Sequence, residues 1–200
     1  MISGKIGRSA LILLGGLATR AGGQAKYLFE YQGETFLQRQ IRVLSSITDE
    51  IIMSCRNEEQ AADISTCYSY PCVIDVRKGM GPVEGIHTGA LQAQGELILV
   101  VACDMPLISS VVIEYIFNQI GDADVAIPGW DDGNLEPLHA VYRRDALLRF
   151  FADHTAVKIR DITDELNRKI IPIHEIRALD PDLTTFTNIN DLQAFRDLKS

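Results

Sequence analysis

Paired cysteines, long apolar runs and excess positive charge are all missing from this chain of 200 residues. Its four cysteines include no C-x-x-C pair and no spacing typical of a zinc site. This pattern favours reduced thiols in a cytoplasmic protein. The apolar run Ala10–Leu14 is too short for the core of a signal peptide or for a membrane span. We therefore expect neither a secretory leader nor a membrane anchor.

The charge balance is acidic, with a formal net charge of −8 and an isoelectric point near 5.0. A nucleic-acid-binding protein would normally carry a basic face, so this class is disfavoured, whereas local cations remain sufficient to bind a nucleotide. Hydrophobic residues make up 46% and charged residues 23%, which is typical of a globular protein. Because the sequence contains no repeat, low-complexity tract or linker, we expect one domain over residues 1–200.

Short apolar runs alternate with longer helical patterns along the chain. Strands are predicted at Ser9–Leu14, Glu50–Cys55, Cys72–Val76, Glu96–Ala102, Asp124–Pro128, Leu138–Arg143 and Lys169–Ile173. Helices are predicted at Thr35–Ile47, Glu84–Gln94 and Val111–Ile120, then twice between residues 143 and 169, and over residues 191–199 after a cap at Asn190 or Asp191. This order predicts an α/β fold, with a mostly parallel sheet between two layers of helices and a ligand site at the carboxyl ends of the strands.

The first strand runs into a glycine-rich, cationic loop, "LLGGLATRAGGQAKYL" (Leu13–Leu28). Gly15 and Gly16 leave backbone N–H groups accessible to an anion, and Arg20 and Lys26 add positive charge. The loop matches neither the Walker A pattern nor the dinucleotide pattern G-x-G-x-x-G. Glycines alone would indicate a flexible turn. Together with the two cations at a strand end, they favour phosphate binding.

Acidic side chains follow two other predicted strands. Asp104 leaves the buried strand in "LILVVACDMP", where a carboxylate is well placed to bind Mg²⁺ together with substrate phosphates. A turn or helix-capping aspartate is the alternative. Asp75 ends the third strand and is suited to accept hydrogen bonds from a base or ribose, or else to close a turn. The second glycine-rich loop, "KGMGPVEGI" (Lys78–Ile86), indicates either a nucleoside contact or a tight turn.

Five motifs occur in order: the glycine loop, "GPVEGI", "ACDMP", "EPLHAVYR" and "FTNINDLQ". Together they resemble the molybdenum cofactor guanylyltransferase family over roughly residues 9–195. The resemblance implies a three-layer, Rossmann-like fold of the glycosyltransferase-A or nucleotidyltransferase type. It also implies Mg²⁺-dependent transfer of GMP from GTP to the terminal phosphate of molybdopterin, releasing pyrophosphate. Molybdopterin-insertion proteins or molybdenum enzymes would be further partners.

The resemblance also assigns roles by position. The residues it places at GTP are Leu14, Gly15, Gly16, Gly23, Lys26, Asp75, Gly81 and Gly85. It implies catalytic roles for Arg20, Lys26 and Asp104, with Asp104 as the metal ligand. Asn188 and Asn190 match the family's N-x-N pattern, which implies the acceptor (pterin) side of the site or its metal side.

Several positions depart from the family pattern. Ala25 stands where the family usually has Asp, Leu14 where it has Ala, and Glu84 where "GPLAG" has Ala. These changes keep the phosphate-binding loop but bear on the choice of base and acceptor. Two alternatives therefore stay open: another nucleotidyltransferase, for example one using CTP and a small phosphorylated acceptor, or a catalytically impaired GTP-binding regulatory relative.

Overall fold

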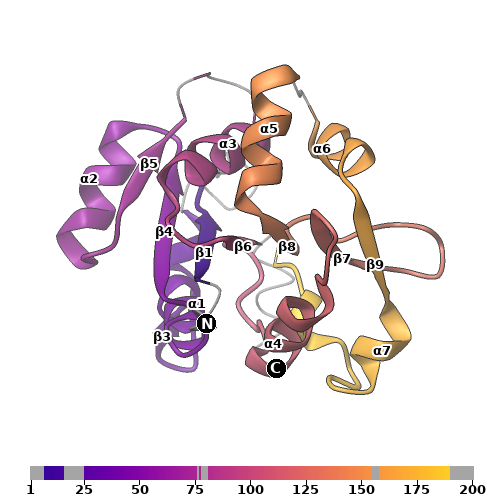
Figure 1. The fold of residues 1–200 in the computed structure, drawn as a ribbon. Coiled ribbons are helices and arrows are strands. Elements are labelled where there is room, and N and C mark those ends of the chain that lie inside the picture. The colour runs from indigo at the N-terminus through magenta and orange to yellow at the C-terminus, as the bar shows by residue number, and fades with distance from the viewer. Residues whose placement is uncertain (1–6, 16–24, 76, 78–80, 155–157, 190–200) are drawn as a thin grey trace, which may run out of the picture.

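The structure is a computed structural model that describes residues 7–15, 25–75, 77, 81–154 and 158–189. Seven strands form the main sheet, in the order β5-β4-β1-β6-β8-β7-β9 (Figure 1). These strands are β1 (Arg8–Leu13), β4 (Glu50–Cys55), β5 (Cys72–Ile74), β6 (Leu97–Ala102), β7 (Val125–Gly129), β8 (His139–Arg143) and β9 (Arg168–Pro172). The short strands β2 (Glu30–Tyr31) and β3 (Glu34–Thr35) form a separate hairpin.

Seven helices and two 3₁₀ turns are described. The helices are α1 (Phe36–Leu44), α2 (Glu58–Cys67), α3 (Pro82–Gln92), α4 (Ser110–Gln119), α5 (Arg144–Asp153), α6 (Ile159–Glu165) and α7 (Ile173–Arg177). The 3₁₀ turns are η2 (Lys26–Leu28) and η3 (Thr184–Phe186). Among the described residues, no helix has both the length and the apolar character required to cross a bilayer.

The sheet is mostly parallel, as the sequence predicts. β1 pairs in parallel with β4 and β6, and β4 pairs in parallel with β5. The exception is β8, which lies antiparallel between β6 and β7. The carboxyl ends of β5, β4, β1 and β6 consequently meet at one edge of the sheet, where parallel α/β sheets bind their ligands.

Helices cover both faces of the sheet, giving three layers. Along β1, Ala10 and Ile12 face one apolar cluster, which α1 and α4 help to form, while Leu11 and Leu13 face the other, which α3 and α5 help to form. Figure 1 shows α3, α5 and α6 together at one end of the view and α1, α4 and α7 at the other. The alternation follows from the two-residue period of a strand, and burial on both faces explains why these strands are almost wholly apolar.

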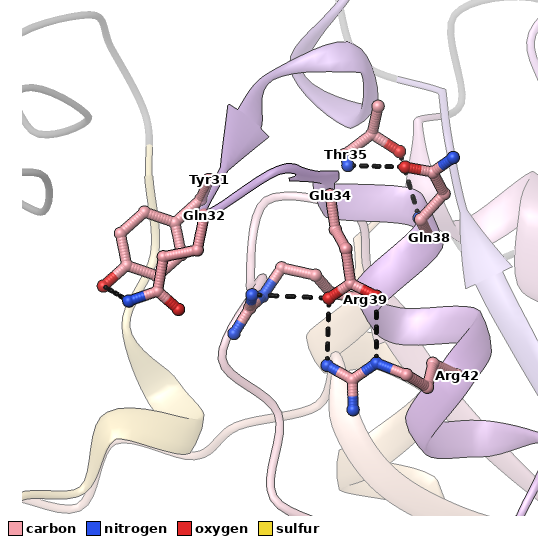
Figure 2. Close-up of polar contacts among 7 residues, drawn as sticks. All are labelled: Tyr31, Gln32, Glu34, Thr35, Gln38, Arg39 and Arg42. Carbon is pink, nitrogen blue, oxygen red and sulfur yellow. Dashed lines mark hydrogen bonds and ion pairs between the residues drawn. The ribbon is translucent and has the colours of Figure 1, made fainter.

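A capping box fixes the start of α1 (Figure 2). The Thr35 hydroxyl accepts a hydrogen bond from the Gln38 backbone N–H at 3.1 Å, and the Gln38 side-chain oxygen accepts one from the Thr35 N–H at 2.8 Å. Two N–H groups that a helix start leaves without intrahelical partners are thereby satisfied. The first turn of α1 is therefore well defined, which matters because this helix reaches the candidate site.

The structure corrects the sequence analysis at several places. Helix α2, between the second and third predicted strands, was not anticipated. Only Gln60 and Ile64 of α2 are buried, so it lacks the apolar stripe that reveals most helices, although Asn57 caps its start by accepting from the Gln60 N–H. The sequence pattern also does not reveal the short helix α7, because the predicted strand Lys169–Ile173 includes Ile173, the first residue of this helix. The predicted helix at residues 191–199 lies outside the described residues.

Candidate active site

A cavity of about 180 Å³ opens at the carboxyl ends of β1 and β6. Its lining combines apolar and charged side chains from segments far apart in the sequence. The lining residues are Leu13, Leu14, Gly15, Ala25, Lys26, Pro82, Ala102, Cys103, Asp104 and Leu138. The cavity therefore lies between the glycine loop, the segment after β6 and the start of α3, where the strand order predicts a ligand site.

Lys26 and Asp104 form an ion pair in this cavity. Lys26 Nζ lies 3.0 Å from Asp104 Oδ2, and the two side chains are 22% and 17% exposed. The second carboxylate oxygen, Asp104 Oδ1, is buried and has no hydrogen-bond partner among the described residues. An ionised carboxylate has about four acceptor positions, so Asp104 keeps the capacity to bind a further cationic group.

Main-chain and side-chain hydrogen bonds hold the turn that carries Asp104. Gln40 of α1 donates to the Ala102 and Met105 carbonyl oxygens at 2.8 and 2.9 Å. The Ile189 N–H donates to the Asp104 carbonyl oxygen at 2.8 Å. Ile189 follows Asn188, so the described part of the predicted N-x-N motif lies beside the Asp104 turn.

A second buried glutamine holds the end of β1. The Gln60 amide donates to the Leu14 carbonyl oxygen at 3.2 Å and accepts from the Arg56 N–H at 2.9 Å. Neither Gln40 nor Gln60 was singled out from the sequence. The available signal for Gln40 was its place in α1, where it occupies the buried face formed by Phe36, Leu37 and Leu44. A polar residue on an apolar stripe indicates a specific buried hydrogen bond.

Asp75 lies beside the glycine loop, directly after β5. A methyl group at Gly15 would be 3.8 Å from Asp75 Oδ2, which places the carboxylate next to the loop backbone. The Ser54 hydroxyl donates to Asp75 Oδ1 at 3.5 Å. Burial, and secondarily the charge of Glu84, raise the pKa of the Asp75 carboxyl above its usual range. The environment of Asp75 therefore disfavours the ionised carboxylate, and shifted pKa values of this kind are common at functional sites.

The structure explains the presence of glycine at two positions of the second loop in different ways. Gly81 precedes α3 with a φ of 59°, a backbone conformation that favours glycine, and a side chain there would meet open space. Gly85 is buried within α3, where an added Cβ would lie 2.5 Å from Ser54 Oγ and 2.9 Å from Leu13 Cδ2. Gly85 therefore allows α3 to approach β4 and β1 closely, and its predicted contact with a nucleotide stays a prediction.

Glu84 is directed into the protein rather than into the cavity. Its side chain is 2% exposed, and its carboxylate accepts from Arg77 Nε at 2.6 Å and from the Arg77 backbone N–H at 3.3 Å. The pair joins the segment after β5 to the first turn of α3. Glu84, which stands where the family's "GPLAG" pattern has Ala, thus links this helix to the segment that precedes it.

Two observations limit the chemistry available among the described residues of the site. Burial raises the pKa of the Cys55 and Cys103 thiols to about 12, so neither supplies a thiolate nucleophile near neutral pH. Among the described residues, no three His, Cys, Asp or Glu side chains cluster as a metal site. Gly16, Arg20, Gly23 and Asn190 lie outside the described residues, so their predicted roles stay predictions.

Comparison with known proteins identifies the family of this chain. Residues 10–170 match the model of a family described as "MobA-like NTP transferase domain". A relative from Methanosarcina acetivorans, named "Probable molybdenum cofactor guanylyltransferase", is 34% identical, with 93% of this chain and 87% of the relative aligned. A relative from Desulfosudis oleivorans, named "Molybdenum cofactor guanylyltransferase", is 30% identical over 91% of this chain and 89% of its own length.

Solved structures of similar shape are also known. The crystal structure of molybdopterin-guanine dinucleotide biosynthesis protein A from Archaeoglobus fulgidus superposes with a TM-score of 0.79. The two sequences are 27% identical, and 96% of each chain is covered. A nucleotidyl transferase from Methanothermobacter thermautotrophicus, at 17% identity and a TM-score of 0.72, shares the fold.

Proposed function

Because this chain belongs to the family of MobA-like NTP transferase domains, we propose that it is a molybdenum cofactor guanylyltransferase. It would transfer GMP from GTP to the terminal phosphate of molybdopterin, giving molybdopterin guanine dinucleotide and pyrophosphate. The observation that carries the proposal is the Lys26–Asp104 pair in a cavity between the glycine loop and the end of β6. Such a site would combine a cation that binds phosphate with a carboxylate ligand for a metal ion.

The residues of the site fit a divalent cation. Asp104 Oδ1 is a buried carboxylate oxygen without a hydrogen-bond partner among the described residues, and carboxylate oxygens are preferred ligands of Mg²⁺. Magnesium usually needs only one or two protein carboxylates, because substrate phosphates and water complete its coordination. When bound, the ion would neutralise charge on the nucleotide phosphates. In this proposal Asp104 holds it.

The reaction requires positioning more than proton transfer. An oxygen of the acceptor phosphate attacks the α-phosphorus of GTP, a new P–O bond forms, and the bond to the β-phosphate bridging oxygen breaks. The electron pair leaves with pyrophosphate. Because the attacking oxygen is already anionic, no general base is needed, and the protein contributes alignment and charge stabilisation.

Each predicted side chain then has a task. Lys26 has three N–H donors, so it can hold a phosphate oxygen while it contacts Asp104. Arg20 and the amides of Leu14, Gly15, Gly16 and Gly23 would hold the triphosphate that becomes pyrophosphate. Asp75 would accept hydrogen bonds from the nucleoside, with Gly81 and Gly85 shaping the loop around it. Asn188 and Asn190 would face the acceptor, which is supported by the hydrogen bond between Ile189 and Asp104.

A nucleotide panel tests the proposal. Purified protein is incubated with molybdopterin, Mg²⁺ and GTP, CTP, ATP or UTP in turn, and the products are identified by mass spectrometry. We expect the guanine dinucleotide and stoichiometric pyrophosphate from GTP. A product from CTP rather than GTP would instead indicate another nucleotidyltransferase. Thermal stabilisation by GTP, about 2.7 kcal/mol at a hundred times the dissociation constant, without any turnover would indicate a regulatory protein.

A further inference from the structure

Gln40 occupies an unusual place for a side-chain amide. It lies on the buried face of α1 with Phe36, Leu37 and Leu44, and none of its surface is exposed. Its Nε2 donates to two main-chain carbonyl oxygens, those of Ala102 at 2.8 Å and Met105 at 2.9 Å. These two residues flank the segment that contains Asp104. One amide group therefore bridges the end of β6 and the residue after Asp104.

The chemistry fixes the orientation of this amide. If Gln40 were turned by 180°, its oxygen would face two carbonyl oxygens, and both contacts would be repulsive. In the orientation described, Gln40 Oε1 is buried and has no hydrogen-bond partner among the described residues. The acceptor without a partner carries a cost, but an apolar side chain of similar size would take the donor away from the Ala102 and Met105 carbonyl oxygens. These two hydrogen bonds are therefore the contribution of Gln40 to the Asp104 turn.

The helix that carries Gln40 is anchored on the side of the hairpin. Besides the capping box, the Glu34 carboxylate accepts two hydrogen bonds from Arg42, at 3.0 and 3.1 Å, and lies 3.5 Å from Arg39 (Figure 2). These contacts tie β3 to Arg39 and Arg42 of α1, beside the buried face that carries Gln40. The amide is thus held by a helix with a defined position, which is what a positioning residue requires.

Other bonds hold the Asp104 turn from different directions. The Ile189 N–H donates to the Asp104 carbonyl oxygen at 2.8 Å, and the Cys103 N–H donates to the Leu13 carbonyl oxygen at 3.2 Å. Gln40 and the Ile189 N–H thus donate to the carbonyl oxygens of residues 102, 104 and 105, and the Cys103 N–H ties the turn to β1. Of these main-chain contacts, the Gln40 bonds come from a side chain, so they can be removed by substitution without changing the backbone.

We propose that Gln40 is a positioning residue for Asp104. It fixes the turn so that the Asp104 carboxylate faces both Lys26 and the metal-bound nucleotide. This inference rests on the proposed function, because it assigns Gln40 a task in that same site. Without the amide, the turn gains backbone freedom, and the carboxylate spends less time in the geometry needed for binding and transfer.

The test compares Gln40→Met, which keeps a similar volume but has no N–H donor, with Thr48→Val. The Thr48 hydroxyl donates to the Leu44 carbonyl oxygen at 2.9 Å near the end of α1, so Thr48→Val also removes a bond between a side chain and a carbonyl. Mn²⁺ affinity is measured by electron paramagnetic resonance in the presence of the α,β-methylene analogue of GTP. The kcat and KM values are measured at saturating metal, and thermal unfolding reports the stability of each variant.

For Gln40→Met we expect a 5- to 20-fold weaker Mn²⁺ affinity and at least a tenfold lower kcat, with KM for GTP within twofold of wild type. Thr48→Val should match the wild type in Mn²⁺ affinity, kcat and KM. Gln40→Leu supplies a second variant without donors if Gln40→Met does not fold. The inference is overturned if a folded Gln40 variant keeps wild-type Mn²⁺ affinity and kcat while Asp104→Asn loses both. The proposed function fails separately, if the wild-type protein forms no dinucleotide.

Discussion

Lys26 and Asp104 are separated by 78 positions in the sequence, yet their side chains meet at 3.0 Å in the cavity between β1 and β6. The pairing of these two neighbouring strands places the glycine loop and the Asp104 turn at the same edge. The ion pair leaves Asp104 Oδ1 without a partner among the described residues. The proposed phosphate-binding cation and the proposed metal ligand are therefore adjacent.

Substitution of either member of this pair should abolish most turnover. Lys26→Met would remove the proposed phosphate contact and Asp104→Asn would weaken the proposed metal ligand, so each should lower kcat by roughly 10²-fold or more, as is typical for loss of one electrostatic contact in a transition state. Stability should fall by roughly 1–3 kcal/mol, because both side chains are mostly buried and removal of one takes this ionic partner from the other. Steady-state pyrophosphate release and thermal unfolding measure the two effects.

The control for this pair is Arg160→Met. Arg160 forms an ion pair of similar length with Asp164, at 3.1 Å, on the exposed side of α6. Because neither residue lines the cavity, Arg160→Met should keep wild-type turnover. Near-normal activity in folded Lys26→Met and Asp104→Asn proteins would rule out the proposed mechanism.

Asp75→Asn should stabilise the protein at neutral pH while weakening nucleotide binding. Burial, and then Glu84, raise the pKa of Asp75 in the folded state, so the folded protein holds this proton more tightly than the unfolded chain does. Stability contributed by the protonated form is therefore lost as pH rises from the unfolded value near 3.8 through the folded pKa. Urea unfolding at pH 7 and at pH 5 should show that the advantage of Asn shrinks on acidification.

Asp145→Asn is the matched control for Asp75→Asn, because the Asp145 side chain is 79% exposed. Its effect on stability should be small at both pH values. A lower stability of Asp75→Asn at pH 7 would contradict the electrostatic argument. Unchanged GTP affinity of Asp75→Asn would show that this carboxylate does not contact the nucleoside.

The sequence predicted the sheet and the edge that carries the site, because apolar runs identify buried strands and polar residues follow their carboxyl ends. It did not predict the antiparallel placement of β8 between β6 and β7, since local patterns do not specify which strands become neighbours. It also missed Gln40, whose role depends on contacts with residues more than 60 positions away. Tertiary hydrogen bonds of this kind leave no periodic signal.

Gly85 illustrates how one residue type can have two explanations. The sequence resemblance indicated a nucleotide contact, whereas the structure supplies a packing reason. Gly85→Ala should destabilise the protein by about 1–3 kcal/mol, because the new methyl group would overlap Ser54 Oγ and Leu13 Cδ2. The Gly85→Ala/Ser54→Ala double variant should recover part of this loss in thermal unfolding. Wild-type stability of Gly85→Ala would contradict the packing explanation.

His139 should make the fold sensitive to acid. Its ring is completely buried, with Nε2 3.3 Å from the Thr185 hydroxyl oxygen and its centroid 5.0 Å from that of Phe186. Burial lowers the pKa of His139 from 6.5 to about 4. The folded state therefore binds this proton less readily than the unfolded chain, and stability is lost as pH falls from 6.5 toward 4. The full loss is on the order of 3 kcal/mol.

His139→Gln tests this because it removes the titrating ring and keeps a polar side chain near Thr185. Urea unfolding between pH 7 and pH 4.5 should show a weaker acid dependence for this variant than for wild type, whereas the exposed His154→Gln should follow wild type. An equal dependence of stability on pH in His139→Gln and wild type would contradict this explanation.

Protonation of His139 should also affect activity, because His139 contacts η3, and the chain continues from η3 to Ile189, whose N–H donates to the Asp104 carbonyl oxygen. Protonation of His139 should therefore loosen the segment that fixes the Asp104 turn.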